Sequence, residues 1–157
     1  MERFYQTMLA YIRSIPTLEK IIIMIAKFFP YIMFITYPLL IIYCFLEKNE
    51  LLLVTIIKPL SAFLLVTIIR KIINRPRPYE TMKIIPLRGH IQGESFPSRL
   101  SVSAVAIALA GAAIDPMLGV FLIIIALIIC LSRILCGVHY PSDVITAIII
   151  ALLINYI

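Results

Sequence analysis

Residues 116–143 read PMLGVFLIIIALIICLSRILCGVHYPSD, and this stretch decides the fold class. It begins with an apolar run that carries no charged side chain between Asp115 and Arg133. A helix needs about 20 residues to cross the hydrocarbon core of a bilayer. The run is therefore typical of a membrane-spanning helix. Ionisable residues beside such a run are costly and mark either a boundary or a function, and here three follow it, namely Arg133, His139 and Asp143.

The composition of the whole chain agrees with a membrane protein. Of its 157 residues, 62% are hydrophobic and 14% are charged, and the mean hydropathy is +1.08. Soluble domains are about 45–50% apolar and about 25% charged, so a water-soluble globule is excluded. The net charge of +6 does not predict a nucleic-acid partner, because the basic residues lie at the ends of apolar runs, where they meet lipid headgroups or phosphate. The cysteines and histidines lack the spacing of zinc ligands, so no metal site is expected.

The apolar runs predict an all-α integral membrane helical bundle with about five transmembrane helices and an N-terminal amphipathic helix. Residues 1–19 carry apolar side chains at helical spacing, and we expect them to lie on the membrane surface as an interfacial helix. Residues 20–157 are expected to form a single membrane-embedded domain. Its spans are predicted at residues 21–46, 51–73, 97–115, 117–133 and 141–157.

The alternation of these spans predicts which polar segments share a membrane face. The long loop at residues 74–96, the start of the third span, the end of the fourth and the start of the fifth fall on one side. The polar turn at residues 47–50 and Asp115 fall on the other. The side chains that could do chemistry should therefore converge on one face. Lys27, inside the first span, is interpreted as a side chain that snorkels to the interface.

Three polar clusters lie on that face, and the first surrounds His139. Asp143 follows His139 by four residues and is expected in the first turn of the last helix, after Pro141. A carboxylate there can hydrogen-bond one ring nitrogen, which leaves the other as a nucleophile or base. Arg133 adds a rigid positive fork for an anion. Taken singly, each residue is better explained as a boundary or capping residue, whereas the three together favour a functional site.

The other two clusters are a helix start and a basic loop. Residues 95–99 (SFPSR) begin the third span, and a helix N-terminus presents free N–H groups suited to phosphate. Residues 70–78 (RKIINRPRP) form a donor-rich, proline-stiffened segment. In isolation, a plain helix start is the better explanation of the first of these clusters, and an anchor for lipid headgroups explains the second equally well.

Together and in this order, the clusters resemble the motifs of the phosphatidic-acid-phosphatase type-2 superfamily of membrane lipid phosphatases. The family pattern is Lys-x6-Arg-Pro, then Pro-Ser-Gly-His, then Ser-Arg-x5-His-x3-Asp. The third motif is complete here, the first has Arg in place of Lys, and the second matches at two of four positions. The matching stretches are Arg70-x6-Arg77-Pro78, Pro97-Ser98-Arg99-Leu100, and Ser132-Arg133-x5-His139-x3-Asp143. The resemblance covers about residues 50–157.

The resemblance implies a role for each motif residue. His139 would attack phosphorus and form a phospho-histidine, with Asp143 orienting the ring. No metal or cofactor is implied, because arginines and helix-terminal amides take the place of a cation. The implied phosphate-binding residues are Arg70, Arg77, Ser98, Arg99 and Arg133.

Leu100 departs from the family pattern, which has at this position a histidine that protonates the leaving oxygen. Leucine donates no proton, and the loss of general acid catalysis costs about 10²–10⁴ in rate. We therefore expect an impaired enzyme, and three accounts stay open. The substitution is engineered, the chain is a natural pseudo-enzyme, or another group such as His90 or Glu94 replaces the acid.

The function predicted on these grounds is removal of a terminal phosphate from a lipid phosphate or an isoprenoid (undecaprenyl-type) diphosphate. The protein is expected to be a multi-pass protein of the cell membrane, with the lipid substrate and the bilayer as its partners. The distribution of basic residues favours a cytoplasmic site, whereas the resemblance implies an extracytoplasmic one, which is our prediction. The alternatives are a non-catalytic lipid-phosphate binder and a small transporter or channel subunit. The crowding of polar residues on one face argues against the transporter.

Overall fold

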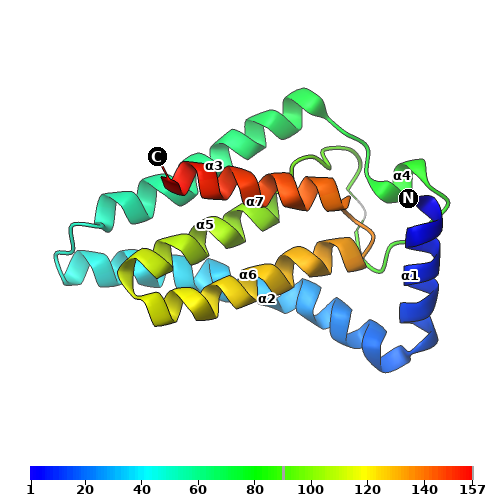
Figure 1. Cartoon of the computed structure of the whole chain (residues 1–157), viewed down its shortest axis with the longest axis horizontal. Coiled ribbons are helices and arrows are strands. Elements are labelled where there is room, and N and C mark those ends of the chain that lie inside the picture. The colour runs from blue at the N-terminus through cyan, green and yellow to red at the C-terminus, as the bar shows by residue number, and fades with distance from the viewer. Residues whose placement is uncertain (90, 157) are drawn as a thin grey trace.

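The computed structural model describes residues 1–89 and 91–156, and these residues form an all-helical bundle (Figure 1). Three helices are long and apolar enough to cross a membrane: α2 (Pro16–Leu46), α3 (Leu52–Ile73) and α6 (Pro116–Leu135). Two shorter apolar helices, α5 (Arg99–Ile114) and α7 (Pro141–Tyr156), pack among them. The predicted all-α membrane bundle is confirmed. The count of five spans stays a prediction, because α5 and α7 have 16 residues each.

The central helix of the bundle is α5, which packs against α2, α3, α6 and α7. Ten of its side chains between Ser101 and Gly111 are buried, and most of them are serine, alanine or glycine. Small residues allow helix backbones to approach closely. Where α6 meets α5, a Cβ atom on Gly119 would lie 2.3 Å from the Cβ atom of Ala112, so only glycine fits. This close packing fixes the N-terminus of α5 at one end of the molecule.

The polar segments gather at that same end of the bundle, on the right of Figure 1. The loop after α3, with the short helix α4 (Pro78–Thr81), lies there together with the end of α6 and the start of α7. The opposite end carries the turn between α2 and α3 and the turn at Asp115, whose carboxylate caps α6 by accepting the N–H of Leu118 at 2.7 Å. This grouping follows the predicted alternation of the spans.

The N-terminal helix α1 (Glu2–Ser14) lies across the polar end of the bundle (Figure 1). It ends one residue before α2 begins, because Ile15 adopts an extended backbone ahead of Pro16. Its inner face buries Tyr5, Leu9 and Ile12. The predicted amphipathic helix is thus present, and its apolar face packs against the rest of the protein. Its placement at a membrane surface stays a prediction.

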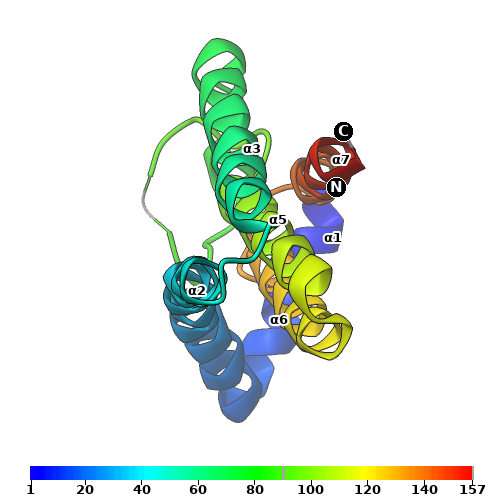
Figure 2. The same ribbon diagram turned by 90° about the vertical axis from the view of Figure 1, so that its left-hand side faces the viewer.

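The helices α2 and α3 spread apart from the turn that joins them (Figure 1, Figure 2), and they are in contact where the Tyr37 hydroxyl donates to the carbonyl oxygen of Ile56 at 3.1 Å. An apolar pocket of about 200 Å³ lies between them, with Phe34 and Tyr37 from α2 and Leu60 and Phe63 from α3 in its walls. Residues of α5 form its floor. This pocket begins beside the polar end, since Phe34 also lines the cavity described next.

Candidate active site

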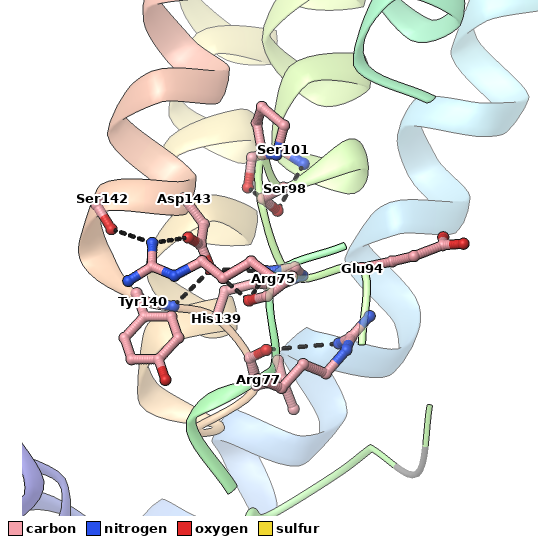
Figure 3. Close-up of polar contacts among 12 residues, drawn as sticks. Arg75, Arg77, Glu94, Ser98, Ser101, His139, Tyr140, Ser142 and Asp143 are labelled. Atoms are coloured by element: carbon pink, nitrogen blue, oxygen red, sulfur yellow. Dashed lines mark hydrogen bonds and ion pairs between the residues drawn. The ribbon is translucent and has the colours of Figure 1, made fainter. Parts of the chain in front are cut away.

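His139 and Asp143 form a contacting pair at the polar end (Figure 3). His139 lies in the turn between α6 and α7, and Asp143 lies in the first turn of α7, where Pro141 starts the helix. The Oδ2 atom of Asp143 is 3.4 Å from the Nδ1 atom of His139, and both side chains are buried. Because Nδ1 is taken by the carboxylate, Nε2 is the ring nitrogen available to a ligand.

Asp143 is held by further groups that the sequence pattern does not predict. Arg75 Nη1 donates to Oδ1 at 2.8 Å, and its guanidinium lies 4.0 Å from the centre of the Tyr140 ring. The hydroxyl of Ser95 and the main-chain N–H of Tyr140 both donate to Oδ2. A buried carboxylate needs such partners, since its charge is costly to remove from water. Both carboxylate oxygens are therefore fixed in place behind the imidazole.

The arginines of the three motifs converge on one cavity of about 380 Å³. Within the described part of the chain, its walls contain no carboxylate. Cations that outnumber the carboxylates near them repel one another, so such a cavity favours an anion. Among the side chains that line it are Arg70, Arg77, Arg99, Leu100, Arg133 and His139.

Arg70 and Arg77 are held against this cavity by main-chain carbonyl groups. Arg70 Nη1 donates to the oxygen of Pro97 at 3.2 Å, and Arg77 Nε donates to that of Gly93 at 3.0 Å. Arg70 Nη2 lies 3.6 Å from the Glu94 carboxylate. The Nε atom of Arg70 is buried and has no partner among residues 1–89 and 91–156. A buried donor left unpaired costs about 1–3 kcal/mol, and a phosphate oxygen in the cavity would satisfy it.

The three residues at the start of α5, Ser98, Arg99 and Leu100, have different surroundings. Ser98 is fully buried and caps the helix: its hydroxyl lies 2.8 Å from that of Ser101 and accepts the Ser101 N–H. Ser98 is not among the described side chains that line the cavity. Arg99 lines it and also lies over the ring of Phe63, 5.5 Å from its centre. Leu100 lines it and packs on the apolar core.

Of the two side chains named as replacement acids, the structure describes only Glu94. His90 lies outside the described residues. Glu94 pairs with Arg70 and is not among the side chains that the structure places in the cavity wall. Among the described residues, no three His, Cys, Asp or Glu side chains are grouped to hold a metal ion.

Three residues at this end have positions that the sequence pattern does not predict. Lys27, interpreted as a snorkelling side chain, and Arg88, from the loop, both line the cavity. Tyr5 of α1 donates its hydroxyl hydrogen to the carbonyl oxygen of His139 at 2.8 Å. The amphipathic pattern of α1 indicates a buried face but says nothing about which surface it covers. Among the described residues, six cationic side chains thus line the cavity rather than the four expected from the motif arginines.

Burial lowers the pKa of His139 from its ordinary value of 6.5; the hydrogen bond to Asp143 opposes this shift, and the nearby charge of Arg77 adds to it. The imidazole is therefore neutral, with a free lone pair, at neutral pH. We expect His139 to titrate below pH 6.5 in an NMR experiment on the histidine-labelled protein. The chain has two histidines, so the variant His90→Gln assigns the signal. Titration of His139 at or above pH 6.5 would contradict this expectation.

The comparisons with known proteins identify the family. The model of the PAP2 superfamily matches residues 49–157, which is more than half of the sequence, and the chain belongs to this superfamily. The resemblance predicted from the three motifs is confirmed. The family model covers the motif-bearing helices α3 and α5–α7 and their connecting loop.

Two curated relatives match about half of the chain. A lipid A 1-phosphatase of Rhizobium etli is 37% identical over 87 residues, which cover 52% of this chain and 38% of the relative. The undecaprenyl-diphosphatase BcrC of Bacillus subtilis is 34% identical over 82 residues, covering 52% of this chain and 42% of the relative. The matched region therefore spans less than half the length of these relatives.

Solved structures show the same fold over almost the whole chain. LpxE from Aquifex aeolicus aligns with a TM-score of 0.78 at 23% identity, covering 98% of this chain and 91% of that one. A PAP2-type phosphatidylglycerolphosphate phosphatase from Bacillus subtilis aligns with a TM-score of 0.63 at 22% identity, covering 98% and 89%. At these identities the likeness establishes the fold, and it includes α1.

Proposed function

We propose that this protein removes the terminal phosphate from a lipid phosphate or an isoprenoid diphosphate of the undecaprenyl type through a phospho-histidine. The observation that carries the proposal is the position of His139, which lines a cavity with six cationic side chains and no carboxylate among its described wall residues. The names of the relatives, a lipid A 1-phosphatase and an undecaprenyl-diphosphatase, agree with this substrate class.

The proposed reaction has two steps. The lone pair of His139 Nε2 attacks the terminal phosphorus while the bond from phosphorus to the leaving oxygen breaks, and that oxygen keeps the electron pair. Asp143 holds the Nδ1–H and stabilises the positive ring. Arg70, Arg77 and Arg133 stabilise the charge on the equatorial oxygens, so the protein's own cations meet the electrostatic demand without a metal or cofactor. Water then attacks phosphorus, releasing inorganic phosphate and free His139.

Leu100 sets the preferred leaving group in this proposal. A lipid monophosphate leaves as an alkoxide, which needs a proton that leucine does not supply. A lipid diphosphate leaves as a lipid phosphate, whose second pKa is about 6, so it departs without protonation. The missing acid therefore costs less for a diphosphate than for a monophosphate.

We expect this protein to release phosphate about tenfold faster, or more, from a polyprenyl diphosphate than from phosphatidic acid. A general acid contributes about 10²–10⁴ in rate, and its absence should slow the monophosphate more than the diphosphate. The measurement is the initial rate of phosphate release in mixed micelles, with both lipids at the same mole fraction. His139→Gln supplies the background rate. Equal residual rates on the two lipids would contradict the leaving-group explanation.

The apolar surroundings of the cavity suit a lipid substrate. Tyr31 and Phe34 of α2 line the cavity, and Phe34 also lines the apolar pocket between α2 and α3. In this proposal the phosphate enters the cavity while the start of the lipid chain occupies that pocket. We place the protein in the cell membrane with the site on the extracytoplasmic face, as the family resemblance implies.

A second candidate function is that of a non-catalytic lipid-phosphate binder, and Leu100 is the observation that favours it. The cationic cavity would bind the headgroup equally well in a protein that never hydrolyses it. The two functions differ in whether phosphate is released, and in the response to restoring a histidine at this position.

A further inference from the structure

Two arginines from different segments share one main-chain acceptor at the wall of the cavity. Arg88, from the loop, donates from Nη1 to the carbonyl oxygen of Ala26 in α2 at 3.0 Å. Arg133, from the end of α6, donates from Nη2 to the same oxygen at 2.7 Å. Both side chains line the cavity. The shared oxygen therefore places two guanidinium groups side by side.

The carbonyl of Ala26 is available because of Pro30. In an α-helix the carbonyl of residue i accepts the N–H of residue i+4, and for Ala26 that residue is Pro30, which has no N–H. Pro30 lies inside α2, is buried, and lines the cavity itself. In the structure, the carbonyl that it leaves free serves as the anchor for Arg88 and Arg133.

The pair also retains donors for a ligand. Among the described residues, no carboxylate lies within 4.0 Å of either guanidinium as an ion-pair partner. The remaining Arg133 contacts are both to the hydroxyl of Ser132, through Nε and Nη2, so Nη1 faces no described hydrogen-bond partner. Arg88 is exposed and Arg133 is half-buried, so Arg88 lies toward the mouth of the cavity. Two adjacent cations with unused donors favour an anion between or beside them.

We propose that Arg88 binds the second, non-transferred phosphate of a lipid diphosphate, and that Pro30 is the positioning residue for this contact. The inference rests on the proposed function and narrows it to one substrate class, the lipid diphosphates. Arg70 and Arg77, beside His139, take the phosphate that is transferred. Arg133 and Arg88 donate to the same carbonyl oxygen, so a phosphate bound at Arg88 lies next to the transferred phosphate. A lipid monophosphate has no second phosphate to bind Arg88.

The test is calorimetric binding of two non-hydrolysable probes to the full chain in detergent micelles. One is the P–C–P analogue of farnesyl diphosphate, and the other is farnesyl phosphonate. We expect Arg88→Gln to weaken the diphosphonate at least tenfold and the monophosphonate less than threefold. Lys83→Gln removes an exposed cation from the same loop that is not among the described cavity residues. It should change neither affinity by more than twofold.

Pro30→Ala restores an N–H that competes for the Ala26 carbonyl, so it should also weaken the diphosphonate at least tenfold. In the Pro30→Ala protein, adding Arg88→Gln should lower the affinity for the diphosphonate by less than a further threefold, because the contact between Arg88 and the second phosphate is already lost. A purely structural defect would instead leave the two effects independent. Pro38→Ala is the matched control in α2, since no described side chain donates to the carbonyl of Phe34 that Pro38 frees. The affinity of Pro38→Ala for the diphosphonate should stay within twofold of that of the unmodified protein.

The outcomes separate this inference from the proposed function. If the unmodified protein binds the diphosphonate but Arg88→Gln weakens both probes equally, or neither, the inference is wrong and the proposed function stands. If Arg88→Gln behaves as expected and Pro30→Ala does not, the positioning role is wrong. If the unmodified protein binds neither probe, the proposed function itself fails. Arg88 is exposed, so its replacement tests the binding role even where Pro30→Ala does not fold.

Discussion

Replacing Leu100 by histidine is expected to raise phosphate release by about 10²–10⁴-fold, the usual contribution of a general acid. Leu100 lies in the first turn of α5 and lines the same cavity as His139. In the proposed reaction, a histidine there would protonate the leaving oxygen while His139 attacks phosphorus. The gain should be larger on phosphatidic acid than on a polyprenyl diphosphate, because the alkoxide needs the proton more. Initial rates on both lipids measure it.

Leu100→Gln is the control for this substitution, since glutamine adds a polar group of similar size that does not act as an acid. It should leave the rates at the level of the unmodified protein. If Leu100→His also leaves them there, the lack of a general acid at this position does not limit the rate. The non-catalytic binder then becomes the better account of the cavity.

His139→Gln is expected to lower phosphate release by a factor on the order of 10⁴ or more, because in the proposed mechanism no other group replaces the lost nucleophile. The measurement is best made in the Leu100→His protein, where the starting rate is high. Rapid acid-free quenching with a radiolabelled substrate should trap label on the protein only when His139 is present. Label that persists in His139→Gln would contradict the phospho-histidine.

Asp143→Asn should lower the same rate by about 10²–10⁴-fold, because the amide holds the ring less well and does not stabilise its positive charge. Asp115→Asn is the matched control at the opposite end of the bundle. Asparagine keeps the cap that Asp115 provides to α6, so the rate should not change. Equal losses in the two variants would indicate a general effect on the fold.

Hydropathy and motif order together predict the helical bundle and the end of the bundle where the motif segments meet. The apolar runs lead to the bundle, because a chain in hydrocarbon must satisfy its backbone within helices. The alternation of spans leads to the meeting of the motif segments, because each connection, short or long, reverses the chain. The spacing of His139 and Asp143 leads to their contact for the same local reason, since four residues across a helix start bring the side chains together.

The rest of the site depends on hydrogen bonds to main-chain atoms, which sequence patterns do not carry. Arg88 and Arg133 meet at one carbonyl group, and that meeting depends on how α2 packs beside α6. Ser98 fits a phosphate-binding motif, yet its hydroxyl is used by Ser101 at the helix cap. A regular pattern predicts that a residue faces inward. It does not predict which backbone oxygen or hydroxyl group lies opposite.

The hydrogen bond from Tyr5 to the carbonyl of His139 joins positions 134 residues apart. During synthesis, α1 emerges long before His139 exists, and α2, α3, α5 and α6 are all made before the hydrogen-bond partner of Tyr5. The last turn and α7 must then return to the beginning of the chain to close the site. A ribosome-bound chain that ends with α6 still lacks His139 and Asp143, so the cavity is completed only late in synthesis.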